Sequence, residues 1–276
     1  MLLKCRKFWI FAILSFFTIH SAARESIQPI AKPSNSFTLG GTAELLDDVY
    51  SADLNTAIEI APCNCLSIYG NASYRFASYK YDVMLHDQRH EAINLKINGF
   101  NEPYLGTKIV PSPFWGIDLA WRFLPGNGSQ QNKFQRLSIA PMALYEFSPN
   151  LELGLSIGYH TFLKRKNFNP GDEIGLKGSL IWHILWNSNR HSGIELSHVF
   201  LYRWRISESE NLNMAKQYQK MDDKYRGFRM RTDVVRYFNL KRTSPGLGFF
   251  YEMNRGNIFG FETGHTIGIY TKFVFP

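Results

Sequence analysis

The clearest pattern in the sequence is the alternation of apolar and polar residues along Leu151–Leu163, LELGLSIGYHTFL. Its odd positions are almost wholly apolar, and its even positions are small or polar. Successive side chains of a strand point to opposite faces, so this alternation predicts a β-strand. Its roughly 12 or 13 residues exceed the five or six of a usual soluble strand and suffice for a tilted strand that crosses a bilayer.

The same alternation recurs and predicts about twelve strands, with no amphipathic helix of useful length between them. The predicted strands include Glu91–Ile97, Lys108–Phe123 and Thr263–Phe275. Within Lys108–Phe123, Pro111 and Pro113 each remove a donor from the strand ladder, which places them near a rim or a bulge. We therefore predict an all-β fold, a transmembrane antiparallel up-and-down barrel, in which an even strand number is the rule.

The connections between the predicted strands alternate between short and long. Short turns are predicted at Pro62–Asn64, Asn98–Pro103, Ser148–Asn150, Asn187–Ser192 and Lys241–Pro245. Most of the other connections are longer, as in Pro125–Lys133, Lys164–Glu173, Ile206–Tyr225 and Arg255–Glu262. Bacterial outer-membrane barrels have short periplasmic turns and longer external loops, so this asymmetry supports the same prediction.

The N-terminus has the pattern of an export signal. Lys4, Arg6 and Lys7 precede the apolar run Phe8–Ile19, and small residues follow up to Ala23. A basic region, a short apolar region and small residues are typical of a cleaved signal peptide, whereas a membrane anchor needs about 20 apolar residues. We predict a signal peptide at residues 1–23, a short lead-in at 24–35 and an outer-membrane barrel at 36–276.

Composition and charge agree with an exported barrel. The chain is 45% hydrophobic and 15% aromatic, yet its mean hydropathy is only -0.23, as expected when apolar and polar residues alternate. Removal of the signal takes three basic residues from the formal charge of +8 and leaves +5. The remaining Lys and Arg are scattered over strands and loops, so no nucleic-acid partner is expected.

The final predicted strand carries a family resemblance. Its alternating apolar residues end in Phe273 and Phe275, similar to the terminal aromatic signature read by the barrel-assembly machinery, although Pro276 follows. The chain resembles the Gram-negative outer-membrane β-barrel proteins as a broad class. The resemblance implies an outer-membrane location, the assembly machinery, outer-membrane lipid and lipopolysaccharide as partners, and a monomer, with Phe273 and Phe275 as the assembly signal.

The polar faces of the predicted strands would line the lumen. Their charged candidates are Glu44, Glu59, Arg75, Asp118, Lys177, Glu195, Arg229, Arg231, Asp233 and Glu252. These charges can conduct or select small solutes, or pair with one another and fill a narrow barrel. Barrels of about 8 strands are filled by side chains and those of about 16 leave a channel, so about twelve leaves a structural and a channel role open.

Outward-facing aromatic residues near strand ends predict an interfacial girdle that anchors the barrel in the membrane. The candidates are Trp115, Trp121, Trp182, Trp186, Tyr202 and Trp204. A binding platform for sugars is the alternative use of such aromatics, but anchoring explains their position near strand ends directly.

An enzyme is one alternative. Outer-membrane phospholipases and lipid A deacylases, which a barrel of this size resembles, carry a His-x-Ser pair on one strand face. Here Ser197 and His198 are adjacent, as are His191 and Ser192, so each pair would point to opposite faces. A lipid-modifying hydrolase is therefore an alternative but not the expectation, and so is a secreted soluble β-barrel that binds ligands.

The cysteines and other potential ligands suggest no cofactor. Cys63 and Cys65 in PCNC remain after signal cleavage, and a disulfide between residues only two apart would be strained. No further Cys or His stands at the spacing that a metal site needs. Two thiols at a turn are the favoured interpretation, an oxidised pair stays open, and neither a metal nor another cofactor is predicted.

Overall fold

The computed structural model describes residues 28–46, 49–84, 90–100, 103–123, 135–163, 171–187, 192–207, 226–238, 243–255 and 263–275. Their strands are β1 (Asn35–Leu46), β2 (Val49–Cys63), β3 (Leu66–Met84), β4 (His90–Phe100), β5 (Tyr104–Ser112), β6 (Trp115–Phe123), β7 (Gln135–Ser148), β8 (Leu151–Phe162), β9 (Glu173–Asn187), β10 (Ser192–Arg205), β11 (Arg226–Tyr237), β12 (Ser244–Arg255) and β13 (Thr263–Phe275). Among these residues there is no helix with the length and apolarity to span a membrane.

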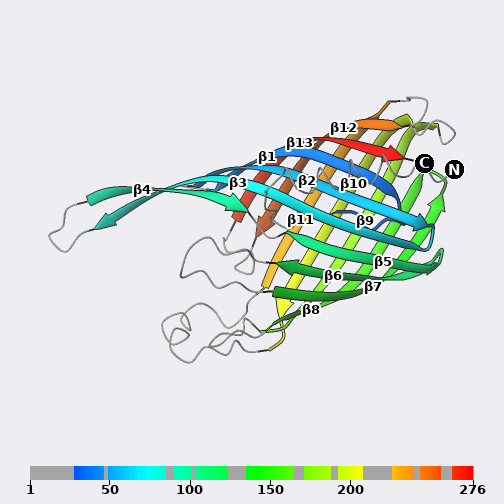
Figure 1. Cartoon of the computed structure of the whole chain (residues 1–276), viewed down its shortest axis with the longest axis horizontal. Helices are drawn as coiled ribbons and strands as arrows, with labels where there is room; N and C mark the ends of the chain where they lie inside the picture. Colours follow the sequence, from blue (N-terminus) through cyan, green and yellow to red (C-terminus); the bar gives the residue numbers. More distant parts are fainter. Residues whose placement is uncertain are drawn as a thin grey trace, which may run out of the picture.

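Twelve of the strands close into one antiparallel barrel (Figure 1). The first and last strands, β1 and β13, complete the cylinder by pairing from Asn35 opposite Phe275 to Leu45 opposite His265. A closed sheet pairs the backbone groups of every wall strand and leaves no edge, which is the condition for a sheet to span lipid. The predicted up-and-down barrel of about twelve strands is confirmed.

The thirteenth strand, β4, lies outside the closed wall. It pairs with residues 74–84 of β3, whereas β5 pairs with residues 66–71 of the same strand. The hairpin of β3 and β4 therefore extends well beyond the barrel (Figure 1). The prediction of a wall strand at Glu91–Ile97 and a reversing turn at Asn98–Pro103 is wrong, because β4 and β5 follow one another in the same direction along β3.

The prediction of one strand at Lys108–Phe123 is also wrong. The structure has a tight hairpin there, in which Pro113 and Phe114 form the turn between β5 and β6. Proline is favoured at the second position of such a turn and cannot donate to the ladder, so the strand ends at this point. Lys108–Phe123 thus contributes two wall strands, and Glu91–Ile97 contributes none. The predicted total of about twelve wall strands is therefore correct.

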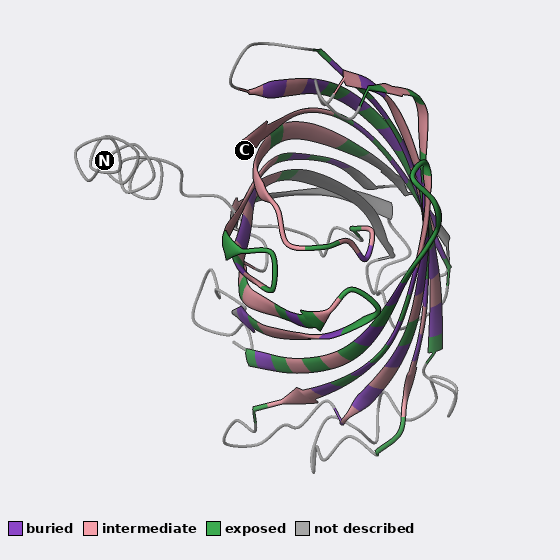
Figure 2. Ribbon diagram, turned by 90° about the vertical axis from the view of Figure 1, so that its right-hand side faces the viewer, coloured by how far each residue is buried: buried purple, intermediate pink, exposed green. Residues whose placement is uncertain are grey.

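The barrel has two different ends. We call the end that holds the start of β1, the end of β13 and the turns at residues 64–65, 113–114 and 149–150 the turn end, and the opposite one the loop end. On β8, Ile157 is 59% exposed and its neighbour Ser156 is 9% exposed. Exposure alternates in this way around the wall (Figure 2), so the apolar face points outward and the polar face inward, the reverse of a soluble barrel.

Candidate functional site: the barrel interior

The barrel encloses a cavity of about 660 Å³, lined by inward-facing residues of all twelve wall strands and by the lead-in segment, residues 28–34. Seven of the predicted lumen residues border it: Glu59, Asp118, Lys177, Glu195, Arg231, Asp233 and Glu252. Arg75 and Arg229 also take part in ion pairs of the wall, and the side chain of Glu44 lies outside the described residues. What these residues do in the lumen stays a prediction.

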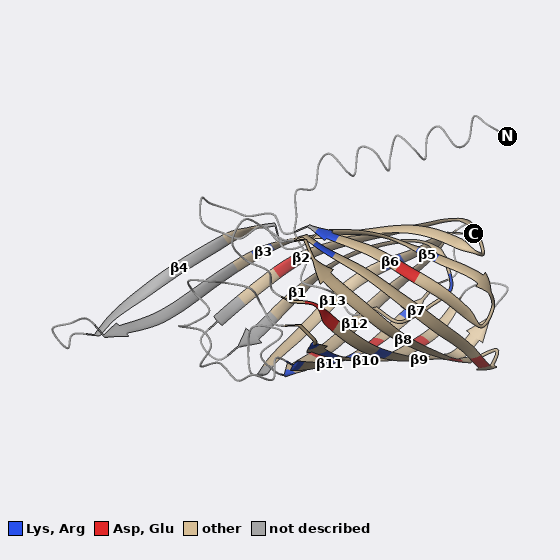
Figure 3. Cartoon of the chain, turned by 90° about the horizontal axis from the view of Figure 1, so that it is seen from below, with Lys and Arg blue, Asp and Glu red and all other residues tan. Residues whose placement is uncertain are grey.

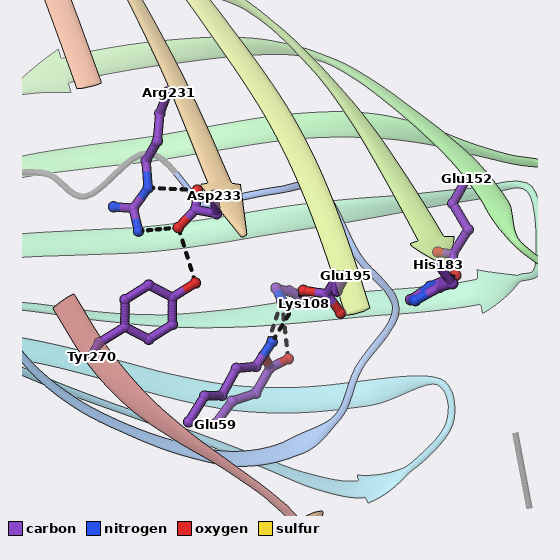
Figure 4. A network of polar contacts seen from close by, with 9 residues as sticks. Glu59, Lys108, Glu152, His183, Glu195, Arg231, Asp233 and Tyr270 are labelled. Carbon is purple, nitrogen blue, oxygen red and sulfur yellow. Dashed lines mark hydrogen bonds and ion pairs between the residues drawn. The ribbon is translucent and has the colours of Figure 1, made fainter. Parts of the chain in front are cut away.

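A buried ion pair on β11 is part of a polar network in the interior (Figure 4). The Arg231 guanidinium donates from Nε to Asp233 Oδ2 at 2.7 Å and from Nη2 to Oδ1 at 2.5 Å. The Tyr270 hydroxyl, on β13, donates to Asp233 Oδ1 at 3.0 Å, and the Arg231 Cζ lies 3.7 Å from the centre of the Phe250 ring. Two parallel charge-assisted hydrogen bonds fix this pair more firmly than a single contact would.

A second network joins β2, β3, β5 and β6 on another part of the wall. Lys108 Nζ lies 3.0 and 3.1 Å from the two carboxylate oxygens of Glu59, which also accepts from the Ser67 hydroxyl at 2.6 Å. The Tyr69 hydroxyl donates to Asp118 Oδ1 at 2.5 Å. Further wall pairs are Arg75–Asp53 at 2.9 Å, His183–Glu152 at 3.3 Å, Arg229–Glu252 at 3.4 Å, Arg203–Glu173 at 3.6 Å and Lys272–Glu195 at 4.0 Å. Charges of both signs are thus interspersed on the wall (Figure 3).

The lead-in segment runs inside the barrel instead of outside it (Figure 2). The Ile30 N–H donates to Ser179 Oγ on β9 at 3.0 Å. The Ile30 side chain is 6% exposed and packs in a cluster with Val110, Met142 and Leu144, which lie in the turn-end halves of β5 and β7. The segment therefore occupies the turn-end half of the lumen.

Two further contacts hold the lead-in segment. A Cβ built on Gly154 of β8 would lie 2.6 Å from the Ile30 Cβ, so the glycine provides the space that the segment fills. Beyond Ile30, Lys32 Nζ forms an exposed ion pair with Glu146 Oε1 at the end of β7. The sequence predicted a short lead-in but not its inward course, because a polar stretch with Pro29 and Pro33 carries no strand pattern.

Two cross-strand pairs of the cavity were not predicted as sites. Arg122 on β6 lies directly opposite Arg136 on β7, and Ser138 lies directly opposite His160 on β8. The Ser138 Oγ and His160 Nδ1 atoms are 2.7 Å apart. The alternation puts each of these residues on a polar face, but their pairing depends on the register between strands. The short turn at residues 149–150 does not give the second pair by itself, because the register between β7 and β8 shifts between Glu146 and Ser148.

The structure places Ser197 and His198 on opposite faces of β10. Ser197 is 1% exposed and borders the cavity, whereas the His198 ring is outside the barrel, with Nδ1 2.9 Å from the Thr232 hydroxyl. A nucleophile and its base need to lie within hydrogen-bond reach, and this pair does not. His191 lies outside the described residues.

The predicted girdle residues occupy both ends of the wall, with one correction. Trp115 and Trp182 face outward near the turn end, and Trp121, Tyr202 and Trp204 lie near the loop end. The outward placement of Trp186 is wrong: its ring borders the cavity, edge-on to Tyr237 with ring centres 5.6 Å apart. Leu185 has a φ of 50°, which interrupts the alternation of β9 just before Trp186. Anchoring by the remaining five stays a prediction.

The predicted assembly signal and the cysteines lie at the turn end. The Phe273 ring, at the end of β13, is 6.4 Å from that of Phe37 on β1, and the role of Phe273 and Phe275 in assembly stays a prediction. Cys63 ends β2 and Cys65 lies in the turn before β3, and both are exposed free thiols. A hydrogen bond between the two thiols lowers the pKa of Cys63 and raises the pKa of Cys65.

A closed antiparallel barrel with an apolar outer face and a polar interior defines the class of transmembrane β-barrels. No family model and no curated protein matches the chain. Among solved structures, the beta domain of the Bordetella autotransporter BrkA aligns with a TM-score of 0.52 at 8% identity, covering 88% of this chain and 99% of that one. By its fold the chain is thus an outer-membrane-type β-barrel.

Two other solved structures align with lower scores. The NanC porin has a TM-score of 0.49 at 11% identity, covering 87% of this chain and 99% of its own. The translocator domain of the autotransporter NalP from Neisseria meningitidis has a TM-score of 0.47 at 4% identity, covering 99% of this chain and 95% of its own. At such identities the likeness concerns the fold alone.

Proposed function

We propose that the protein resides in the outer membrane as a channel for small polar solutes, with its turn end toward the periplasm. The observation that carries this proposal is the cavity of about 660 Å³ lined by polar and charged side chains. Water and small solutes cross a barrel through such a polar interior. The apolar outer face supports residence in a membrane, and the short turns at one end support the orientation.

The lead-in segment restricts this channel at its turn end. Its described residues, 28–34, continue directly into β1 and are held by the Ile30–Ser179 hydrogen bond, the apolar cluster and the exposed Lys32–Glu146 pair. These contacts can be released without opening any strand of the wall, because none of them belongs to the strand ladder. The resting channel is therefore narrow, and displacement of the segment widens it.

Single-channel recording in planar bilayers tests both parts of the proposal. The chain that starts at Arg24 should give small current steps, and a variant without residues 24–33 should give steps several-fold larger. A variant in which residues 28–33 are replaced by Gly and Ser keeps the segment's length and serves as the matched control for its contacts. The absence of steps from all three proteins would instead support a closed structural barrel.

The same preparations test the location. A membrane barrel should be recovered with the outer-membrane fraction and should migrate differently on a gel before and after heating. Recovery as a soluble protein that needs no detergent would contradict the membrane proposal and favour the secreted soluble barrel.

A further inference from the structure

The turn between β2 and β3 carries two exposed thiols at the turn end of the barrel. Cys63, the last residue of β2, pairs with Leu66, the first residue of β3, so Asn64 and Cys65 are the two central residues of the turn. Both cysteines are exposed free thiols, and the Cys65 thiol donates a hydrogen bond to the Cys63 sulfur. The two sulfur atoms therefore lie close together and are open to solvent.

Hydrogen bonds to the neighbouring strands hold this turn on both sides. The Val110 N–H, on β5, donates to the Cys65 carbonyl oxygen at 2.7 Å. On the other side, the Ala61 N–H near the end of β2 donates to Asn35 Oδ1, on β1, at 2.9 Å. The backbone that carries the thiols is thus fixed by the wall, so a ligand that binds both thiols has little chain left to order.

Two thiols without further ligands suit a restricted set of metal ions. A thiolate is a soft ligand that selects soft metal ions, Cu⁺ among them. Zn²⁺ in structural sites takes four ligands, but among the described residues no group of three or more Cys, His, Asp or Glu is placed to hold a metal ion. Cu⁺ and Ag⁺, in contrast, are satisfied by two thiolates. The missing four-ligand spacing, which argued against a metal in the sequence, therefore does not exclude these ions.

We propose that Cys63 and Cys65 form a two-coordinate site for a soft monovalent metal ion, Cu⁺ or Ag⁺. Each thiol releases its proton as its sulfur binds the ion, and the ion keeps its charge, so the step needs neither an oxidant nor a reductant. Neither cysteine is among the residues that border the cavity, so the site does not depend on the proposed channel. In the proposed orientation the site faces the periplasm.

Titration of the detergent-solubilised, full predicted mature chain with Cu⁺, with ascorbate and without oxygen, tests the site. Bicinchoninate, which forms a coloured complex with Cu⁺, competes with the protein, and the loss of colour measures transfer of the ion. The wild type should take one ion per chain. Each of Cys63→Ser and Cys65→Ser should weaken binding at least about tenfold, because a single thiol remains. Asn64→Gln changes the residue between the cysteines, keeps both thiols and should bind Cu⁺ like the wild type. Ag⁺ should displace the bound Cu⁺, and Zn²⁺ should not.

The stoichiometry distinguishes a site within one chain from an ion that bridges two chains. One ion per two chains, no uptake by the wild type, or uptake by either single variant as strong as that of the wild type would overturn the proposal. So would a loss in Asn64→Gln as large as in the serine variants, because the turn and not the thiols would then determine uptake. Prior reduction and a thiol assay verify that both cysteines are free, and heat-dependent gel migration verifies that each variant has folded. Because the titration needs no open pore, its outcome is independent of the current steps.

Discussion

Around the lead-in segment, the barrel interior is packed by Ile30 against Val110, Met142 and Leu144, whereas elsewhere, the turn end included, it is bridged by ion pairs between wall residues. Arg231–Asp233 and Arg229–Glu252 belong to this second region. In the first region, wall residues contact a segment that is not part of the sheet. In the second region, wall residues contact one another.

The difference determines which part of the interior can change. Releasing the lead-in segment exposes a few apolar side chains and breaks the Ile30–Ser179 hydrogen bond. It also breaks one exposed ion pair, which contributes about 0–1 kcal/mol. Breaking a buried pair in the wall leaves a charge without its counterion in a site of low dielectric constant. This costs far more free energy than breaking an exposed pair. We therefore expect the lead-in segment to move and the charged wall to stay fixed.

The largest effect should follow from Asp233→Asn. The change keeps the shape of the side chain but leaves the Arg231 guanidinium buried without its carboxylate, and it weakens the acceptor of the Tyr270 hydroxyl. Breaking a buried pair costs about 3–5 kcal/mol in the free energy of unfolding. Urea unfolding of the barrel in lipid vesicles, followed by tryptophan fluorescence, measures this loss.

The matched control for that variant is the double replacement Arg231→Met/Asp233→Leu. It removes both charges and keeps apolar volume, so it should lose much less stability than Asp233→Asn. Equal losses in the two proteins would mean that the wall is not held by the ion pair, and the contrast between the two regions would fail.

A smaller effect is expected from Gly154→Val at the turn end. The new Cβ would lie 2.6 Å from the Ile30 Cβ, and overpacking of this kind costs about 1–3 kcal/mol. The lead-in segment can relieve the clash by leaving the lumen, so amide exchange at Ile30 should rise by about tenfold or more while exchange in the wall stays slow. Gly41→Ala is the control, since the nearest atom to its Cβ would be 3.9 Å away. Unchanged exchange at Ile30 would mean that the wall yields instead.

The sequence predicted the wall better than the contents of the barrel. The period of two along Leu151–Leu163 defines which side chains face inward, because that period is local and needs no knowledge of neighbouring strands. Segments such as β4 alternate equally well, and alternation alone does not reveal whether a strand joins the closed wall. Pro113 was predicted to lie near a rim or a bulge of a single strand, and the structure places it in the turn between β5 and β6.

Contacts that depend on register or on distant residues could not be predicted. The neighbours Arg122 and Arg136 face each other only because of the register between β6 and β7. The Ile30–Ser179 hydrogen bond spans 149 residues of sequence, and a stretch without periodicity gives no sign of its partner. Both contacts are thus tertiary, and both required the structure.

The smallest expected effect concerns the rim of the turn end, which carries both cysteines of the predicted mature chain. The thiol of Cys65 lowers the pKa of Cys63 through a hydrogen bond, while the pKa of Cys65 is raised. Iodoacetamide reacts with the thiolate. At about pH 8, below the ordinary pKa of a thiol, Cys63 should therefore be alkylated a few-fold faster than Cys65. The advantage of Cys63 should shrink as the pH rises and both thiols ionise.

Peptide mass spectrometry after timed labelling measures the two alkylation rates. Cys65→Ala removes the donor and should slow the labelling of Cys63, whereas Cys65→Ser retains a donor and should slow it less. Equal rates for the two thiols at all pH values would contradict the hydrogen bond at this turn.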